Sequence, residues 1–518
     1  MKATHQSLHE VGSFSKMFLD YLSGNPSLSQ FYAYEPKIEA FESAIKNRVF
    51  DGAKRTALAA AITKQYSGLE ISDQIKKNLE SLRSNHTFTV TTGHQLNIFT
   101  GPLYFIFKIV TTLNLAKKLN QAYPHCHFVP IYWMASEDHD FEEIDHFNLF
   151  GKKYTWETKQ TGAVGRFDPS SLKAIIDSLP EKIELFEKAY GNFNTLSDSV
   201  RYYVNELFGA GGLIVLDADE PSLKAQFSSV IKDDIINQKA NDLVEQTNLS
   251  LSQIGYSSQA FSRKINFFYL DAHRRRIIPE DGLFKVHGSN LTFSKSEMIA
   301  EIDSHPERFS PNVIMRPVYQ EAILPNLAYL GGPAEIIYWL QLKGIFDHYS
   351  LNFPILMPRN FGMLVNRVTE KRMTKLDVHI KDLFQSKQAL KASFIQKNSN
   401  NEHLLDLEKQ DLKIVFDQIE KKARSINQSL IGFIGAESSK ALKALENIEK
   451  RLLKGQETQN EIGLNQLEAL KDKLFPGGVL QERHENFLNF YLNNPRFIQD
   501  LIDHFDPFDY IFYILWEE

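Results

Sequence analysis

A histidine in a glycine turn is the most chemically suggestive feature of the sequence. The β-rich run 87–92 stops at Gly93, His94 and Gln95, and Gly101 and Pro102 open the helix-like run that follows. A strand, a glycine turn and a helix N-terminus in this order form a natural cradle for a phosphate or a nucleotide. A histidine there can supply charge or a proton to a phosphate in transit. A plain strand-to-helix corner with a capping or solvated histidine explains the same residues.

A dense polar run follows the next apolar stretch, 128–134. It starts at Ser136 and continues through Glu137, Asp138, His139 and Asp140. Ligands of open α/β sheets bind at the carboxyl ends of strands, so this run is well placed. Its side chains could hold a divalent metal, orient an amine or act as a general base. A solvated acidic turn that caps the next helix is the alternative, and the position after a buried strand favours function.

Two further polar sets also follow apolar runs. Asp217 comes after 213–216 and could bind a ribose or a substrate amine, although capping of the helix after Pro221 explains it equally well. A Gly-Gly-Pro turn farther along lets a ligand approach the backbone at a helix N-terminus. The cluster around that turn comprises Arg316, Tyr329, Gly331, Gly332, Glu335, Tyr338 and Arg359.

Two basic features are interpreted as structural. The run 293–296 is similar to the lysine loop with which class I aminoacyl-tRNA synthetases hold ATP phosphates. However, Ser294 followed three residues later by Glu297 is typical of a capping box ahead of a helix. The three consecutive arginines at 274–276 are typical of a solvated turn.

The bulk numbers limit the class of protein. A chain of 518 residues predicts two to four units. Its 58 basic and 64 acidic residues give a net charge of -6, which argues against nucleic-acid binding. Cys126 is the single cysteine, which excludes an intramolecular disulfide and a cysteine-based metal cage and suits a reducing cytosol. No apolar run approaches the ~20 residues that span a bilayer. We expect a cytoplasmic protein with no membrane or nucleic-acid partner.

The elements that must position these residues are predicted by the apolar patterning. Residues 1–80 are mostly amphipathic and predict helices that pack on a core. From 81 to 375, buried apolar runs alternate with helix-like runs and predict a parallel α/β sheet. Antiparallel-looking pieces near 145–170 and 263–295 are expected to be insertions carried on that sheet.

The segment 376–475 has a different texture. Apolar residues recur in alternating steps of four and three, which is a heptad pattern. Gly432 to Gly435 interrupts it, and a second run follows, which predicts an antiparallel hairpin of about 35-residue helices projecting roughly 50 Å. The first heptad run comprises Leu412, Phe416, Ile419, Ala423, Ile426, Leu430 and Phe433.

The aromatic end of the chain, within 476–518, is too apolar to be free and is expected to dock back on the core.

Three long motifs carry a resemblance to a known family. They are TTGHQLNIFTGPLYFIFK at 91–108, PIYWMASEDHDFEEIDH at 130–146, and the residues from SPNVIMRPVYQ to PILMPRN within 310–360. Together they resemble the cysteine ligases of bacillithiol biosynthesis, the BshC family, over about 80–365. The heptad arm and the aromatic tail fit this family as well. The resemblance implies a Rossmann-type core with connecting-peptide insertions at about 145–205 and 222–310, a coiled-coil arm, and a homodimer formed through that arm.

The implied reaction joins the carboxyl group of L-cysteine to the amine of glucosaminyl-malate and forms bacillithiol. A carboxylate does not acylate an amine in water without activation, so ATP or another nucleotide is expected, and magnesium could accompany it. The second histidine of the synthetases' paired-histidine signature is absent, as is a lysine loop, which argues against a standard adenylate mechanism. A nucleotidyl transferase of the same fold with another small substrate, and a non-enzymatic coiled-coil adaptor, are the alternatives.

We expect catalytic roles for His94, Asp138 and His139. His94, with Asn97 and the backbone near Gly101, would steady phosphate charge. The cluster from Glu137 to Asp140 would bind the cysteine ammonium or deprotonate the attacking amine. Arg316 or Arg359 would hold the malyl carboxylates. The expected substrate-binding residues are Gln95, Asn97, Glu137, Asp140, Asp217, Arg316, Tyr329, Gly331, Gly332, Glu335 and Arg359.

Overall fold

The computed structural model describes residues 1–398, 404–459 and 461–517. The chain divides into two compact units. The first, which we call the body, comprises Met1–Met363 and Leu480–Leu515. The second, the arm unit, comprises Leu364–Val479 and the chain end from Trp516. The division falls before the boundary expected at 375, because α17 (Arg367–Leu376) packs on a helix of the arm unit.

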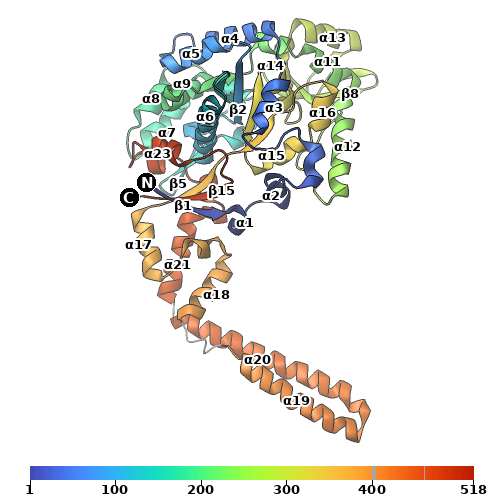
Figure 1. Ribbon diagram of the computed structural model, residues 1–518, viewed down its shortest axis with the longest axis vertical. Helices are drawn as coiled ribbons and strands as arrows, with labels where there is room; N and C mark the ends of the chain where they lie inside the picture. Colours follow the sequence, from blue (N-terminus) through green and yellow to red (C-terminus); the bar gives the residue numbers. More distant parts are fainter. Residues whose placement is uncertain (399–403, 460, 518) are drawn as a thin grey trace. The chain divides into compact units, whose positions relative to one another are not determined.

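A five-stranded parallel sheet forms the centre of the body (Figure 1). Its order is β13-β12-β2-β3-β6, so the first of these five strands in the chain, β2, lies in the middle and the order reverses between β2 and β12. This is the Rossmann arrangement, and it confirms the predicted fold class. The strands are β2 (Thr87–His94), β3 (His127–Met134), β6 (Ile214–Asp217), β12 (Asn326–Gly331) and β13 (Ile355–Pro358).

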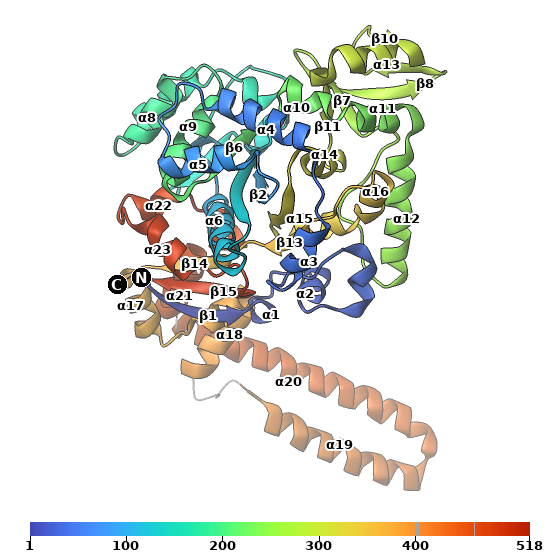
Figure 2. The same cartoon turned by 45° about the horizontal axis from the view of Figure 1, so that its top comes forward.

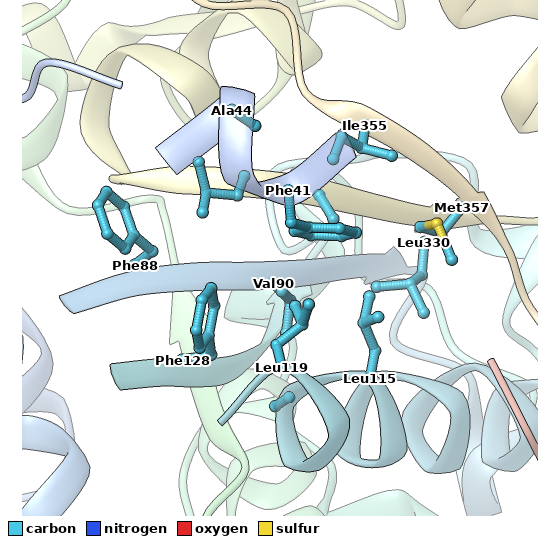
Figure 3. Packing of buried hydrophobic residues seen from close by; sticks show 13 residues of the cluster. Phe41, Ala44, Phe88, Val90, Leu115, Leu119, Phe128, Leu330, Ile355 and Met357 are labelled. Carbon is cyan, nitrogen blue, oxygen red and sulfur yellow. The ribbon is translucent and has the colours of Figure 1, made fainter. Parts of the chain in front are cut away.

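The sheet is buried against helices, which explains its near-continuous apolar strands. Helix α6 (Tyr104–Ala122) packs on β2 and β3 and lies beside β2 in both ribbon views (Figure 1, Figure 2). Phe41 of α3 (Ala40–Asn47) and Leu119 of α6 join one core cluster with Val90, Phe128 and strand residues of β12 and β13 (Figure 3). The rigid sheet therefore fixes the strand ends that carry the polar motifs.

The insertions are antiparallel, as predicted. The first contains a hairpin of β4 (His146–Leu149) and β5 (Lys152–Thr155). The second contains a five-stranded sheet in the order β10-β9-β8-β7-β11. Its strands are β7 (Phe267–Leu270), β8 (Arg274–Glu280), β9 (Leu283–Val286), β10 (Thr292–Phe293) and β11 (Phe309–Pro311).

Helices complete the insertions and the body. Those of the insertions are α7 (Lys173–Ser178), α8 (Glu184–Gly191), α9 (Leu196–Phe208), α10 (Pro221–Ala225), α11 (Ser228–Asn237), α12 (Lys239–Gln253) and α13 (Lys295–Ser304). The others after the N-terminal segment are α14 (Met315–Ile323), α15 (Pro333–Leu340), α16 (Lys343–His348), α22 (Leu488–Tyr491) and α23 (Phe497–His504). No helix in the described part of the chain is long and apolar enough to cross a membrane.

The two ends of the chain meet in a three-stranded sheet of order β1-β15-β14. The segment 1–80 is mostly helical, as predicted, but it begins with a strand, because Lys2–Ser7 forms β1 beside β15 (Ile511–Trp516). A short polar edge strand has no local signal, since its partner lies at the other end of the chain. The third strand is β14 (Phe361–Val365). The N-terminal helices are α1 (Leu8–Val11), α2 (Lys16–Leu22), α3, α4 (Gly52–Gln65) and α5 (Asp73–Ser81).

The arm unit is helical, and its longest helices pair as the predicted hairpin. Helices α19 (Asp406–Ile426) and α20 (Ile431–Gln459) run side by side (Figure 2). The predicted break at Gly432–Gly435 is wrong, because both glycines lie inside α20. The turn comes earlier, where the Asn427 side chain accepts a hydrogen bond from the Ser429 N–H at 2.9 Å and bends the chain as effectively as a glycine. Helices α18 (Lys387–Asn398) and α21 (Glu461–Leu474) pack together.

Candidate active site

A cavity of about 630 Å³ opens at the carboxyl ends of β2, β3 and β12, where the strand order of the parallel sheet reverses. This is the place where open α/β sheets bind their ligands. Side chains of α6, α14 and α15 and of the antiparallel sheet complete its wall. Nine of the predicted site residues line it: His94, Gln95, Glu137, Asp138, His139, Asp140, Arg316, Tyr329 and Glu335.

His94 ends β2 and is held between aromatic rings. Its imidazole stacks on Phe105 at 5.1 Å and meets the edge of Tyr104 at 5.3 Å between ring centroids. Burial, with the nearby charges of Lys108 and Arg359, holds the pKa of His94 well below its ordinary value. The ring is therefore neutral, so it can hydrogen-bond to a ligand but does not carry the positive charge that was one of the two contributions expected from the sequence. Its Nε2 atom is buried without a partner among the described residues, so it is free for a ligand.

Lys108 is a site residue that the sequence interpretation missed. Its Nζ donates to the Gly93 carbonyl at 2.9 Å and to Glu335 Oε1 at 2.5 Å, and its side chain is 1% exposed. Burial lowers the pKa of Lys108, although Glu335 partly offsets this effect. Glu335 also accepts a hydrogen bond from the Tyr329 hydroxyl at 3.0 Å. Lys108 therefore links the glycine turn that carries His94 to the cluster around the Gly-Gly-Pro turn. The available signal was that Lys108 is the only charged residue within the apolar stretch 103–116.

Arg316 places a second cation on the same side of the cavity. Its Nη1 donates to Gln320 at 3.0 Å, while its Nη2 is buried without a partner in the described part of the chain. The guanidinium carbon lies 5.3 Å from the ring centroid of Tyr329. A Cβ at Gly93 would lie 3.3 Å from the Tyr329 hydroxyl and 3.5 Å from Arg316 Nη1, which explains the glycine before His94. The free donor makes Arg316 suited to a bound anion.

Asp138 is a firmly ionised carboxylate. It accepts hydrogen bonds from Gln95 Nε2 at 2.7 Å, from Arg274 Nη1 at 3.1 Å and from the His139 N–H at 2.8 Å. Burial raises the pKa of Asp138, but His139, Arg274 and Gln95 together outweigh burial and hold it well below its usual range. Asp138 can therefore bind an ammonium group without giving up its charge.

The interpretation of 274–276 as a solvated turn is wrong. These arginines lie in β8, and the Arg274 side chain is only 8% exposed. Besides Asp138, Arg274 binds the Ser310 hydroxyl at 3.0 Å and the Pro311 carbonyl at 2.7 Å. Strand pairing places this charge in the cavity, and the local sequence does not reveal that pairing.

Glu137, the neighbour of Asp138, has the opposite electrostatic character. It forms a buried ion pair with Lys224, whose Nζ also donates to the Phe309 carbonyl at 2.9 Å. Burial raises the pKa of Glu137 to about 7, despite the opposing effect of Lys224. Two adjacent carboxyl groups with pKa values pushed apart can divide the roles of proton acceptor and fixed charge. His139 and Asp140 lie at the exposed rim of the cavity.

Asp217 lies in a separate cavity of about 530 Å³. It accepts a short hydrogen bond from Ser136, a residue that lines both cavities. Burial, with the charge of Asp219, raises the pKa of Asp217. The structure therefore places Asp217 behind the main cavity rather than in it.

The remaining predicted residues support the cavity from outside. Asn97 donates to the Glu143 carbonyl at 2.8 Å and packs against Gly101, where a Cβ would lie 2.5 Å from the Asn97 Cβ. Arg359 forms a buried ion pair with Glu482 at 2.6 Å, with side chains 3% and 0% exposed. Its charge is thus already compensated by a residue near the end of the chain.

The glycines of the Gly-Gly-Pro turn act through the backbone. The Gly331 carbonyl accepts from the Arg359 N–H at 3.0 Å. A Cβ at Gly331 would lie 2.9 Å from the Glu335 Cβ, so glycine is needed for Glu335 to reach Lys108. Gly332 caps the N-terminus of α15 ahead of Pro333.

Comparison with known proteins agrees with this architecture. The family model described as "Bacillithiol biosynthesis BshC, N-terminal Rossmann-like domain" matches residues 1–360. The model described as "Bacillithiol biosynthesis BshC, C-terminal coiled-coil domain" matches residues 362–517. The two models meet within a few residues of the division between the body and the arm unit.

Curated relatives match nearly the whole chain, and each carries the name "Putative cysteine ligase BshC". The protein of Flavobacterium psychrophilum is 42% identical, with 98% of each chain covered. The protein of Flavobacterium johnsoniae is 41% identical, with 94% of each chain covered. The protein of Cytophaga hutchinsonii is 39% identical, with 96% of each chain covered. The chain therefore belongs to the BshC family of bacillithiol biosynthesis.

Proposed function

We propose that the protein is a cytoplasmic ligase that joins the carboxyl group of L-cysteine to the amine of glucosaminyl-malate and so forms bacillithiol, the last step of its biosynthesis. The names of its relatives support the reaction class. One structural observation carries the assignment of the site. Two cations, the buried Lys108 and the half-buried Arg316, share one cavity with two carboxyl groups of contrasting pKa, Glu137 and Asp138. Such a cavity suits substrates that bring both an ammonium and an anionic group.

Activation of the cysteine carboxylate is the first step. A carboxylate oxygen would attack a phosphorus atom of ATP or a similar nucleotide, and the bond from that phosphorus to its leaving group would break. Attack at the α-phosphorus would release pyrophosphate and give an acyl-adenylate, whereas attack at the γ-phosphorus would release the nucleoside diphosphate and give an acyl-phosphate. Lys108 and Arg316 would stabilise the negative charge of the transferred group, and neutral His94 would hydrogen-bond to it through Nε2. Magnesium would enter with the nucleotide phosphates, as it does in many phosphoryl-transfer sites.

Amide formation is the second step. The amine of glucosaminyl-malate attacks the activated carbonyl carbon, the new C–N bond forms, and the bond to the nucleotide or phosphate breaks. Glu137 would take the proton that leaves the nitrogen, because a pKa of about 7 suits a general base at neutral pH. Asp138, oriented by Gln95 and Arg274, would hold the cysteine ammonium. His139 and Asp140 at the rim would contact the incoming amine substrate.

A homodimer through the arm is part of this proposal. The α19–α20 hairpin leaves apolar residues of the heptad pattern in solvent, with Ile426 79% and Phe433 65% exposed. A coiled-coil face of this kind is normally buried against a partner. A second copy of the arm presents the same apolar pattern and is the partner we propose.

The assignment of the site is tested with His94→Ala and Asp138→Ala. Bacillithiol formation would be followed by mass spectrometry, with circular dichroism to show that each variant is folded. The matched control is Lys117→Ala, an exposed residue of α6. Loss of product in both variants but not in the control supports the proposal. Full activity in both variants would place the site elsewhere, and tight ATP binding without cysteine-dependent turnover would favour a nucleotidyl transferase with another substrate.

A further inference from the structure

A smaller cavity of about 410 Å³ adjoins the main cavity on the antiparallel sheet. The two share Arg263, Phe268 and Asn312 in their walls, so they lie next to each other. We call the smaller one the extension. Its wall is otherwise formed by β7, β8 and the segment that precedes β7.

The extension is basic and apolar. Arg263, Lys264 and Arg276 line it, the described lining residues include no Asp or Glu, and the remainder is mostly Ile, Phe and Pro. Within the described ranges, the side chains of these three cations form no hydrogen bond or ion pair. By contrast, Arg274 is paired with Asp138 and Arg275 with Asp271 in the same strand. Burial, and then the charge of Arg276, lowers the pKa of Arg263, because the two cations line the same cavity.

Strand geometry connects these cations to the catalytic cavity. In the β7–β8 pairing, Arg276 lies opposite Phe268 and Arg274 lies opposite Leu270. Alternate residues of a strand point to the same face, so Arg274 and Arg276 share a face and Arg275 points to the other. Two residues along a strand span about 7 Å. Arg276 therefore lies about this distance along β8 from Arg274, the residue that is bonded to Asp138.

The segment that carries Arg263 and Lys264 is held in place by hydrogen bonds around Asn266. The Arg263 N–H donates to Asn266 Oδ1 at 3.0 Å, and Asn266 is buried. Asp234 accepts from the Asn266 N–H at 2.7 Å and from its Nδ2 at 3.1 Å. Asn312 Nδ2 donates to the same Asn266 oxygen at 3.0 Å. The backbone of this subsite is therefore preorganised, which lowers the entropy cost of binding.

We propose that Arg263, Lys264 and Arg276 bind the two carboxylates of the malyl group of the amine substrate. The proposal rests on the function proposed above and names the residues that select its second substrate. In glucosaminyl-malate the malyl group is attached to the sugar carbon next to the one that bears the amine. An amine held at Glu137 therefore keeps the malyl carboxylates within a few ångströms of the main cavity, where the adjoining extension offers them cations. This replaces the sequence assignment to Arg316 or Arg359. Arg316 is the cation proposed above for the transferred group, and Glu482 already neutralises the charge of Arg359.

The test compares Arg263→Gln, Lys264→Gln and Arg276→Gln with Arg275→Gln, which removes a charge from the opposite face of the same strand. Each of the first three should raise KM for glucosaminyl-malate by about tenfold, the typical effect of losing a charged hydrogen bond. KM for L-cysteine and for ATP should stay unchanged. The preference for glucosaminyl-malate over glucosamine, which lacks the malyl group, should fall by the same factor. Arg275→Gln should behave like the unaltered protein.

Two results would overturn the subsite. One is a rise in KM for ATP with KM for glucosaminyl-malate unchanged, which would make nucleotide phosphates the occupant. The other is an equal effect of Arg275→Gln, which would mean that the strand's total charge, not its cavity face, matters. If the unaltered protein makes no amide product, the proposed function is wrong, and this result does not by itself refute the subsite. Calorimetric titration of glucosaminyl-malate then tests the subsite alone, with binding that Arg276→Gln weakens about tenfold as support and no binding to the unaltered protein as refutation.

Discussion

Lys108 is the most buried cation of the catalytic cavity, and its removal should be costly. Lys108→Met would remove the charge that pairs with Glu335 and that we propose stabilises the transferred group. Loss of one preorganised donor to developing charge typically lowers kcat by about 10²–10³. Steady-state kinetics on Lys108→Met and on the exposed control Lys117→Met measure this effect. Equal activity of the two variants would show that Lys108 serves only to hold Glu335 in place.

The pKa of Glu137 predicts how activity depends on pH. The carboxyl group accepts a proton only when ionised, and burial raises its pKa to about 7. Below this value, kcat/KM should fall about tenfold per pH unit, and above it the rate should level off. Glu137→Gln should have little activity and should lose this acid limb. A limb that persists unchanged in Glu137→Gln would assign the titration to another group.

Site residues at strand ends could be predicted from the sequence, whereas buried pairings could not. His94, Glu137 and Asp138 each follow a recognisable apolar run, and the fold gathers them at one edge of the sheet. Lys108 and Arg274 acquire their roles only through tertiary contacts. Arg359 resembles a free cation in the sequence, but its partner Glu482 lies more than 100 residues later in the chain.

At the scale of elements, the residues 293–296 at the start of α13 can be tested as a helix cap or as a loop that binds phosphate. Ser294 and Glu297 form a capping box in the structure, as predicted. Ser294→Ala should lower the free energy of unfolding by about 1 kcal/mol, measured by urea denaturation. Lys295→Gln should leave KM for ATP unchanged. A tenfold rise in that KM would mean that 293–296 contacts the nucleotide after all.

Elements with strong local signals were predicted well. The buried runs of β2, β3, β6 and β13 all belong to one parallel sheet, and both antiparallel insertions form where expected. The failures have physical causes. Strand β1 is polar and depends on a partner at the far end of the chain. The turn of the arm uses Asn427 instead of the glycines, which α20 accommodates on exposed positions.

At the scale of the whole molecule, the arm should determine the oligomeric state. Ile426→Glu combined with Phe433→Glu would place charges on the exposed apolar face of the hairpin, where they oppose burial against a second copy. Light scattering should then report half the mass of the unaltered protein. The catalytic cavity lies within the body, so turnover should persist in the monomer. A strictly monomeric unaltered protein would contradict the dimer.

The most direct test combines the purified protein with glucosaminyl-malate, L-cysteine, ATP and magnesium. Mass spectrometry would follow bacillithiol, and chromatography would separate AMP from ADP. We predict bacillithiol together with one cleaved nucleotide per product, AMP for an acyl-adenylate or ADP for an acyl-phosphate. Nucleotide cleavage that is independent of cysteine, or no amide product from these components, would contradict a cysteine ligase that acts alone at this cavity.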